Sequence, residues 1–133
     1  MSGYTHSARG RRSGEPRPLE LLIDPAETHG YAAVLKLCGE HDLATAVEVQ
    51  DALDSISGTL LVDLSDGDFI DSTVISVLIR DSRARVREGH GLELLAPLEN
   101  ETITRTLELA GLRDAIVIHS SQPELRPGFA AAS

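Results

Sequence analysis

The sequence predicts an α/β domain with a mixed sheet of four to five strands and helices packed mainly on one face of it. Short apolar segments alternate with segments whose apolar residues recur every three or four positions, as strands and crossover helices do. The chain has 133 residues, which suits one domain. Hydrophobic residues make up 41% of the chain, enough to form a core. Aromatic residues make up only 3%, so the core must consist of Leu, Val, Ile and Ala.

Five segments are predicted to be strands because they are short and either apolar or alternating. Residues 59–64, TLLVDL, are almost wholly apolar, as in a central strand that is covered on both faces. The other strands are expected at 19–23, where an edge strand fits, and at 31–38, 92–95 and 115–119.

Helices are predicted over residues 43–56, 72–87 and 101–110, and Asp42 is a good N-cap for the first. A short fourth helix is expected to begin near Ser121. The residues expected to face the core are Leu43, Ala46, Val49, Leu53 and Ile56 in the first helix, Ile75, Leu78, Ile79, Ser82 and Val86 in the second, and Ile103, Leu107 and Ala110 in the third.

The two ends of the chain differ from its middle. Residues 1–18 carry four arginines against one glutamate, are rich in Gly, Ser and Pro, and are predicted to form a disordered basic tail. The α/β domain is expected to span residues 19–126, and residues 127–133 to be flexible.

Composition disfavours several classes of partner. The net charge of −9 argues against binding to nucleic acid or to an anionic membrane, and favours a basic protein surface. We find no apolar run of the roughly 18 residues that span a membrane, and the N-terminus lacks the apolar stretch of a secretory signal. Cys38 is the only cysteine, which fits a reducing cytoplasm.

The segment Val62–Val74 is the strongest candidate for a functional site. A buried strand ends there, an acidic loop follows, and Ser72 opens the next helix. In α/β sheets functional residues gather beyond the carboxyl ends of strands, and a helix N-terminus favours an anion such as a phosphate on Ser72. The plainer interpretation is that Asp71 or Ser72 only caps the helix.

Enzymatic interpretations have less support. The acids of this segment could suggest a cation or phosphoryl-transfer site, but no Walker lysine, no Gly-x-Gly-x-x-Gly motif and no histidine cluster accompanies them. A solvated acidic loop is the better interpretation, and we expect no catalytic residue, metal or cofactor.

Four motifs, in this order and spacing, resemble those of STAS domains, particularly anti-sigma factor antagonists. Gly39–Asp42 resembles the family's Gly-Glu-x-Asp, and Val62–Ser65 its central-strand Val-Asp-Leu-Ser. Phe69–Thr73 resembles the family's phosphorylation segment, and Ala110–Leu112 the end of its third helix.

The resemblance implies a STAS fold and a site. Ser72 matches the phosphoacceptor, and Thr73 is the neighbouring hydroxyl residue. Asp71 matches the acid before the acceptor, and Asp42 the acid that borders the same surface. Val74 departs from the glycine that is usual there, and its bulk is expected to hinder a kinase or alter the choice of partner. The implied partner-binding residues are Glu40, His41, Asp42, Asp66, Asp68, Asp71, Ser72, Thr73 and Val74.

The implied function is partner switching in the cytoplasm. The unmodified protein would bind an anti-sigma factor of the serine-kinase type and release a sigma factor for transcription, and phosphorylation of Ser72 would end the interaction. Two alternatives stay open, a STAS interaction subunit that is never phosphorylated and a domain that senses a small molecule or nucleotide. A weak homodimer is also left open.

Overall fold

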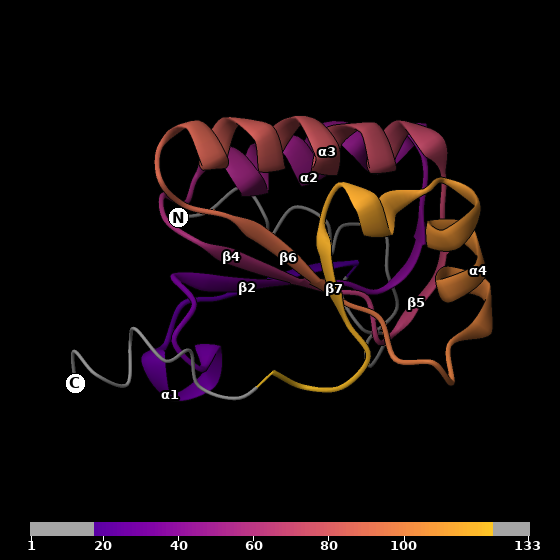
Figure 1. Ribbon diagram of the computed structural model, residues 1–133, viewed down its shortest axis with the longest axis horizontal. Coiled ribbons are helices and arrows are strands. Elements are labelled where there is room, and N and C mark those ends of the chain that lie inside the picture. The colour runs from indigo at the N-terminus through magenta and orange to yellow at the C-terminus, as the bar shows by residue number, and fades with distance from the viewer. Residues whose placement is uncertain (1–17, 124–133) are drawn as a thin grey trace.

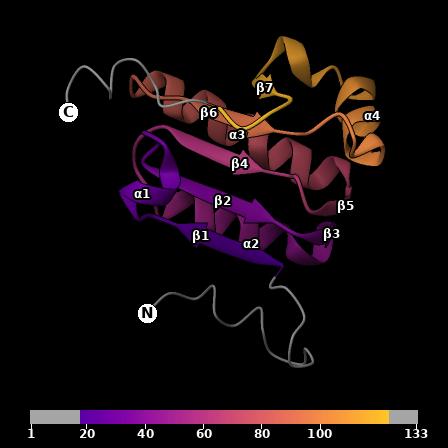
Figure 2. The same ribbon diagram turned by 90° about the horizontal axis from the view of Figure 1, so that it is seen from below.

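Five strands form the central sheet in the order β1-β2-β4-β6-β7 (Figures 1 and 2). β1 pairs with β2 antiparallel, and every other neighbour in this sheet is parallel, so the predicted mixed α/β fold is confirmed. The computed structural model describes residues 18–123; the expectations for the tail before Pro18 and for the chain after Pro123 lie outside the described residues. The strands of this sheet are β1 (Leu19–Leu22), β2 (Ala33–Leu37), β4 (Leu60–Asp63), β6 (Leu92–Leu95) and β7 (Val117–His119).

Two long helices cover one face of the sheet, as expected. α2 (Leu43–Asp54) and α3 (Ser72–Arg87) lie side by side on that face, whereas the short α1 (Pro25–Thr28) lies on the opposite side (Figure 1). α4 (Glu101–Leu109) packs beyond the end of the sheet, against a short strand, β5 (Gly67–Ile70) (Figure 2).

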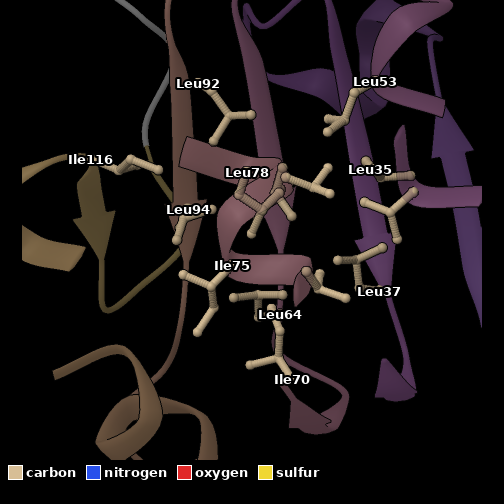
Figure 3. Packing of buried hydrophobic residues seen from close by; sticks show 14 of the residues in the cluster. Leu35, Leu37, Leu53, Leu64, Ile70, Ile75, Leu78, Leu92, Leu94 and Ile116 are labelled. Atoms are coloured by element: carbon tan, nitrogen blue, oxygen red, sulfur yellow. The ribbon is translucent and has the colours of Figure 1, made fainter. Parts of the chain in front are cut away.

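The main core lies between the sheet and the helices α2 and α3. Alternation along the strands builds it, since Ala33, Leu35 and Leu37 of β2 point toward the helices while Val34, between Ala33 and Leu35, belongs to a smaller cluster on the other face. Leu78 of α3 lies at the centre of the main cluster, among residues from β2, β4 and β6 (Figure 3). Leucine, isoleucine, valine and alanine fill the core, as the composition predicts.

Three details of the predicted helix faces are wrong. Ala110, expected to face the core, is exposed and is the C-cap residue that follows α4. Leu43 is 71% exposed, because the buried stripe of α2 begins one turn later, at Ala46. In α3 the stripe is turned by one residue, so that Arg85 is buried in the place expected for Val86, which is exposed.

Arg85 joins the end of α3 to the end of α2. Its side chain is paired with Asp81, one turn earlier, at 2.6 Å between Nε and Oδ2, and the two residues are 5% and 9% exposed. Its guanidinium also donates to three backbone carbonyls at the end of α2 and in the loop after it, those of Leu53 at 2.6 Å and of Ile56 and Gly58 at 2.8 Å. The last carbonyls of a helix have no partners within the helix, so this arginine supplies them.

Four short elements were not predicted from the sequence: the helix α1, the strands β3 (Gly39–His41) and β5, and a 3-10 helix, η2 (Leu112–Asp114). The helix α1 begins with Asp24 as N-cap and Pro25 as first residue, a combination that suits a helix start. The two strands lie in segments that were expected to be turns. They form a second, two-stranded sheet, in which β3 pairs in parallel with β5. The described part of the segment from Ser121 is not helical.

Candidate functional site

The small sheet of β3 and β5 brings two helix N-termini together. Each strand leads within one residue into a helix, β3 into α2 and β5 into α3. The Asp71 N–H donates to the His41 carbonyl at 3.0 Å, and the Gly39 N–H to the Asp66 carbonyl at 3.0 Å. Asp42 and Ser72 therefore lie at the same end of the protein, as two segments that form one surface must.

Asp42 and Asp71 are the N-caps of these two helices. The Asp42 carboxylate accepts from the Ala44 N–H at 2.9 Å, and the Thr45 hydroxyl oxygen accepts in return from the Asp42 N–H at 3.2 Å. The Asp71 carboxylate accepts from the Thr73 and Val74 N–H groups at 3.0 and 3.2 Å. Asp71 therefore caps α3, as the plainer interpretation of the sequence had it, and it occupies two of the amides at the start of this helix.

Ser72 is the first residue of α3, and its side chain is exposed. Its hydroxyl is within reach of another protein, as a phosphoacceptor must be. Thr73, the second hydroxyl residue, is half-buried, and its N–H is held by Asp71. Of the two, Ser72 is better placed for modification.

Acidic side chains line the small sheet that leads to Ser72. Glu40 is exposed on β3, Asp66 in the turn before β5 and Asp68 on β5, and they add to the two cap carboxylates. None of these acids takes part in the ion pairs found among residues 18–123. This acidic surface, defined by Glu40, Asp42, Asp66, Asp68, Asp71 and Ser72, carries charge that favours a basic partner.

Three exposed apolar side chains near this surface were not among the expected site residues. Leu43 and Val47 are one turn apart on the outer side of α2, and Phe69 of β5 pairs in register with Glu40 of β3. Exposed apolar groups beside charges are typical of protein-binding surfaces. Leu43 and Val47 share an i, i+4 spacing that could have shown this, but Leu43 was assigned to the core and Val47 to no site.

His41 is buried and corrects one expectation. It is 1% exposed, so its side chain does not belong to the contact surface. Its Nε2 faces the carbonyls of Pro18 and Cys38 at 3.0 and 3.1 Å, and a carbonyl only accepts, so Nε2 carries the proton. Nδ1 of the neutral ring accepts from the Thr45 hydroxyl at 3.1 Å. His41 thus fixes the turn that presents Glu40 and Asp42, and it holds Pro18, assigned above to the tail, against the fold.

We predict that His41 makes stability depend on pH. Burial lowers the pKa of His41 below its ordinary value of 6.5 despite its hydrogen bonds to two carbonyls. The unfolded chain then binds a proton at a pH where the folded protein does not, so the free energy of unfolding falls as the pH drops below about 6.5. Urea titrations between pH 8 and pH 5 should show a steeper loss in the wild type than in His41→Gln. Parallel curves would contradict the prediction.

Val74 is fully buried and corrects a second expectation. It is 0% exposed and its side chain is part of the main core, so its bulk cannot obstruct a kinase that approaches Ser72. The departure from the family's glycine is therefore a matter of packing, and we leave Val74 out of the contact surface.

Val74→Gly should destabilise the protein without changing how readily Ser72 is modified. Losing a buried valine and gaining helical glycine together cost about 2–4 kcal/mol. Val86→Gly, at an exposed position of the same helix, is the matched control and should cost only about 0.5–1 kcal/mol, the glycine penalty alone. Urea denaturation measures both. Faster phosphorylation of Val74→Gly at unchanged stability would restore the original expectation.

Other kinds of site receive no support within the described residues. Between Pro18 and Pro123 no three His, Cys, Asp or Glu side chains are grouped as a metal site requires. A hollow along α4, lined by Leu98, Thr102 and Arg105 among others, includes no residue of the acidic surface. In the same part of the chain no helix has the length and apolar character needed to cross a membrane.

The fold and the site define a small α/β module that presents two helix N-termini at one acidic surface. The family described as "Mlab, STAS domain" matches residues 26–119, most of the chain, and the protein therefore belongs to the STAS domain family. No curated protein sequence matches the chain.

Solved structures of anti-sigma factor antagonists share this fold. One, from Mycobacterium paratuberculosis, is 22% identical with a TM-score of 0.63, over 80% of this chain and 90% of that chain. SpoIIAA in its unphosphorylated form is 19% identical with a TM-score of 0.58, over 75% and 86%. The phosphorylated form of this Bacillus cell fate determinant is 16% identical with a TM-score of 0.55, over 75% and 89%. At these identities the similarity shows the fold.

Proposed function

We propose that the protein is an anti-sigma factor antagonist that binds an anti-sigma factor of the serine-kinase type through its acidic surface. The observation that carries the proposal is the placement of Ser72. It is an exposed hydroxyl at the first position of α3, next to the cap Asp71, whose N–H is bonded to the strand β3 that leads into α2. The solved antagonists of the same fold support the choice of partner.

Regulation follows from the same placement. In the proposed switch, the Ser72 Oγ attacks the γ-phosphorus of ATP held by the partner. A new O–P bond forms, the bond to the β-phosphate oxygen breaks, ADP leaves, and the hydroxyl proton passes to a base of the kinase. The unmodified protein would bind the anti-sigma factor in the cytoplasm and so free a sigma factor for transcription, and the modified protein would release its partner.

Incubation with serine-kinase anti-sigma factors from the same organism tests the proposal. Pull-down without ATP should retain one of them, and addition of ATP should place one phosphoryl group on Ser72, located by mass spectrometry of peptides. Ser72→Ala should bind but stay unmodified, and Thr73→Ala should be modified as the wild type is. Absence of binding to every such factor would contradict the proposed function.

Binding without modification would favour a STAS interaction subunit that is not phosphorylated. Stabilisation of the purified protein against heat by a nucleotide or other small molecule, without any protein partner, would favour the sensing domain. Sedimentation of the purified protein alone would show whether it forms the weak homodimer that the sequence analysis left open.

A further inference from the structure

We propose that Asn100 is a positioning residue of the acidic surface, because its side chain ties the turn before β5 to the start of α4. This inference rests on the proposed function in one respect, the importance of that turn for the partner. Asn100 is partly buried and lies outside every segment that the sequence analysis connected with the site.

Two groups of one side chain serve two different elements. The Oδ1 of Asn100 accepts from the Ile103 N–H at 3.3 Å, which makes Asn100 the N-cap of α4. Its Nδ2 donates to the carbonyls of the turn, to Gly67 at 2.7 Å and more weakly to Leu64 at 3.3 Å and Ser65 at 3.4 Å. Because the donors face carbonyls and the acceptor faces an N–H, the partners fix the orientation of the amide.

The turn also has restraints of its own, since the Asp63 carboxylate accepts from the Ser65 N–H at 2.9 Å and from the Ser65 hydroxyl. Within it the Gly67 N–H donates to the Leu64 carbonyl at 3.0 Å, and across it the Gly39 N–H reaches the Asp66 carbonyl at 3.0 Å. Gly67 packs closely against its surroundings, since a Cβ there would lie 3.3 Å from the Leu64 carbonyl oxygen and 3.4 Å from Cδ1 of Ile103. The turn is therefore seated on α4, and Asn100 is the polar connection between them.

The direction in which two acids point depends on this connection. Asp66 lies inside the turn and Asp68 directly follows it, and both are exposed. The like charges of the acidic surface repel one another, and an exposed turn moves unless hydrogen bonds restrain its backbone. The amide of Asn100 thus holds the carbonyls of the turn, so that Asp66 and Asp68 stand at fixed places on the acidic surface.

Two substitutions of Asn100 can separate its role as the cap of α4 from its role as a donor to the turn. Asn, Asp, Ser and Thr all serve as N-caps, but among them only Asn also offers N–H donors to the turn. Asn100→Ser should therefore keep the cap of α4 and lose the connection, whereas Asn100→Ala should lose both. Thr102→Ala, at an exposed position of α4, is the control.

Hydrogen exchange of the full chain, followed residue by residue, tests the connection directly. In Asn100→Ser the amides of Gly39 and Gly67 should exchange about ten-fold faster than in the wild type, the loss expected for one net hydrogen bond. The amides of Ile103 to Leu107 should keep their protection in this variant and lose it in Asn100→Ala. Unchanged exchange at Gly39 and Gly67 in Asn100→Ser would show that Asn100 only caps α4, and the proposal would be wrong.

Affinity for the anti-sigma factor retained by the wild type, measured by calorimetry, tests the consequence. Asn100→Ser should bind several-fold more weakly, and Thr102→Ala as tightly as the wild type. Faster exchange with unchanged affinity would overturn the positioning role while leaving the proposed function intact. If the wild type itself binds no such factor, the proposed function fails, and the exchange result alone then decides whether Asn100 positions the turn.

Discussion

Arg85→Ala is expected to lower the free energy of unfolding by about 3–5 kcal/mol, the cost of breaking a buried ion pair by removing one partner. The substitution leaves the Asp81 carboxylate buried without its cation. It also removes the guanidinium donors from the carbonyls of Ile56 and Gly58, and the stronger of the donors from that of Leu53; a buried polar group without a partner is unfavourable. Urea denaturation followed by circular dichroism measures the loss.

Arg83→Ala provides the matched control, because Arg83 is an exposed arginine of the same helix. It should change the free energy of unfolding by no more than about 0.5 kcal/mol. Equal losses in the two variants would mean that Arg85 acts only through helix propensity. If Arg85→Ala leaves too little folded protein to measure, Arg85→Met combined with Asp81→Leu should recover much of the stability, since apolar residues often replace a buried pair without loss.

The sequence predicted the layers of the fold because their signals are local. The central strand Leu60–Asp63 is apolar over its whole length, and the buried positions of α2 recur with the helical period from Ala46 onward. Asp42 was predicted as a cap from its own residue type and position, and it is one. Patterns of this kind are visible without any knowledge of the neighbouring segments.

The sequence did not reveal the elements whose stability comes from distant partners. β3 has three residues, two of them polar or charged, and becomes a strand only because β5 lies beside it. Arg85 and Asp81 resemble a solvated i, i+4 pair, and nothing local shows that the carbonyls at the end of α2 will meet the guanidinium. His41 lies between two exposed acids, and only the alternation of β3 distinguishes its inward position.

The site was predicted in outline for the same reason. The motif around Phe69–Thr73 indicated Ser72 and Asp71, which lie together with Asp42 in the structure. The sequence analysis could not show that Asp71 already occupies the first amides of α3, nor that Val74 faces the core. The side-chain direction at the start of a helix depends on how that helix is rotated against the sheet.

Phosphorylation of Ser72 is expected to weaken binding to the anti-sigma factor on the order of a hundred-fold or more while leaving the fold intact. The phosphate brings a charge of about −1.5 to −2. A serine kinase must hold its nucleotide phosphates directly beside Ser72 to transfer one of them. The product therefore faces nucleotide phosphates across the interface and Asp71 on its own side, and juxtaposed like charges cost several kcal/mol in binding.

The fold should tolerate the new charge because Ser72 is exposed at the start of α3. The helix dipole favours an anion there by roughly 0.3–1 kcal/mol, which partly offsets repulsion from Asp71. Phosphorylated protein and Ser72→Asp should both keep native circular dichroism and a similar melting temperature. Calorimetric titration with the anti-sigma factor and ADP should show the loss of affinity, larger for the phosphate than for the smaller charge of Asp.

Ser57→Asp supplies the control for net charge, since it adds the same charge at an exposed position beyond the opposite end of α2. It should bind as the wild type does, and Ser72→Ala should bind at full affinity both before and after incubation with ATP. Retention of wild-type affinity by protein that is fully phosphorylated on Ser72 would end the hypothesis of an electrostatic switch. Equal losses of affinity in Ser57→Asp and Ser72→Asp would mean that overall charge weakens binding. A local effect at the contact surface would weaken binding in Ser72→Asp alone.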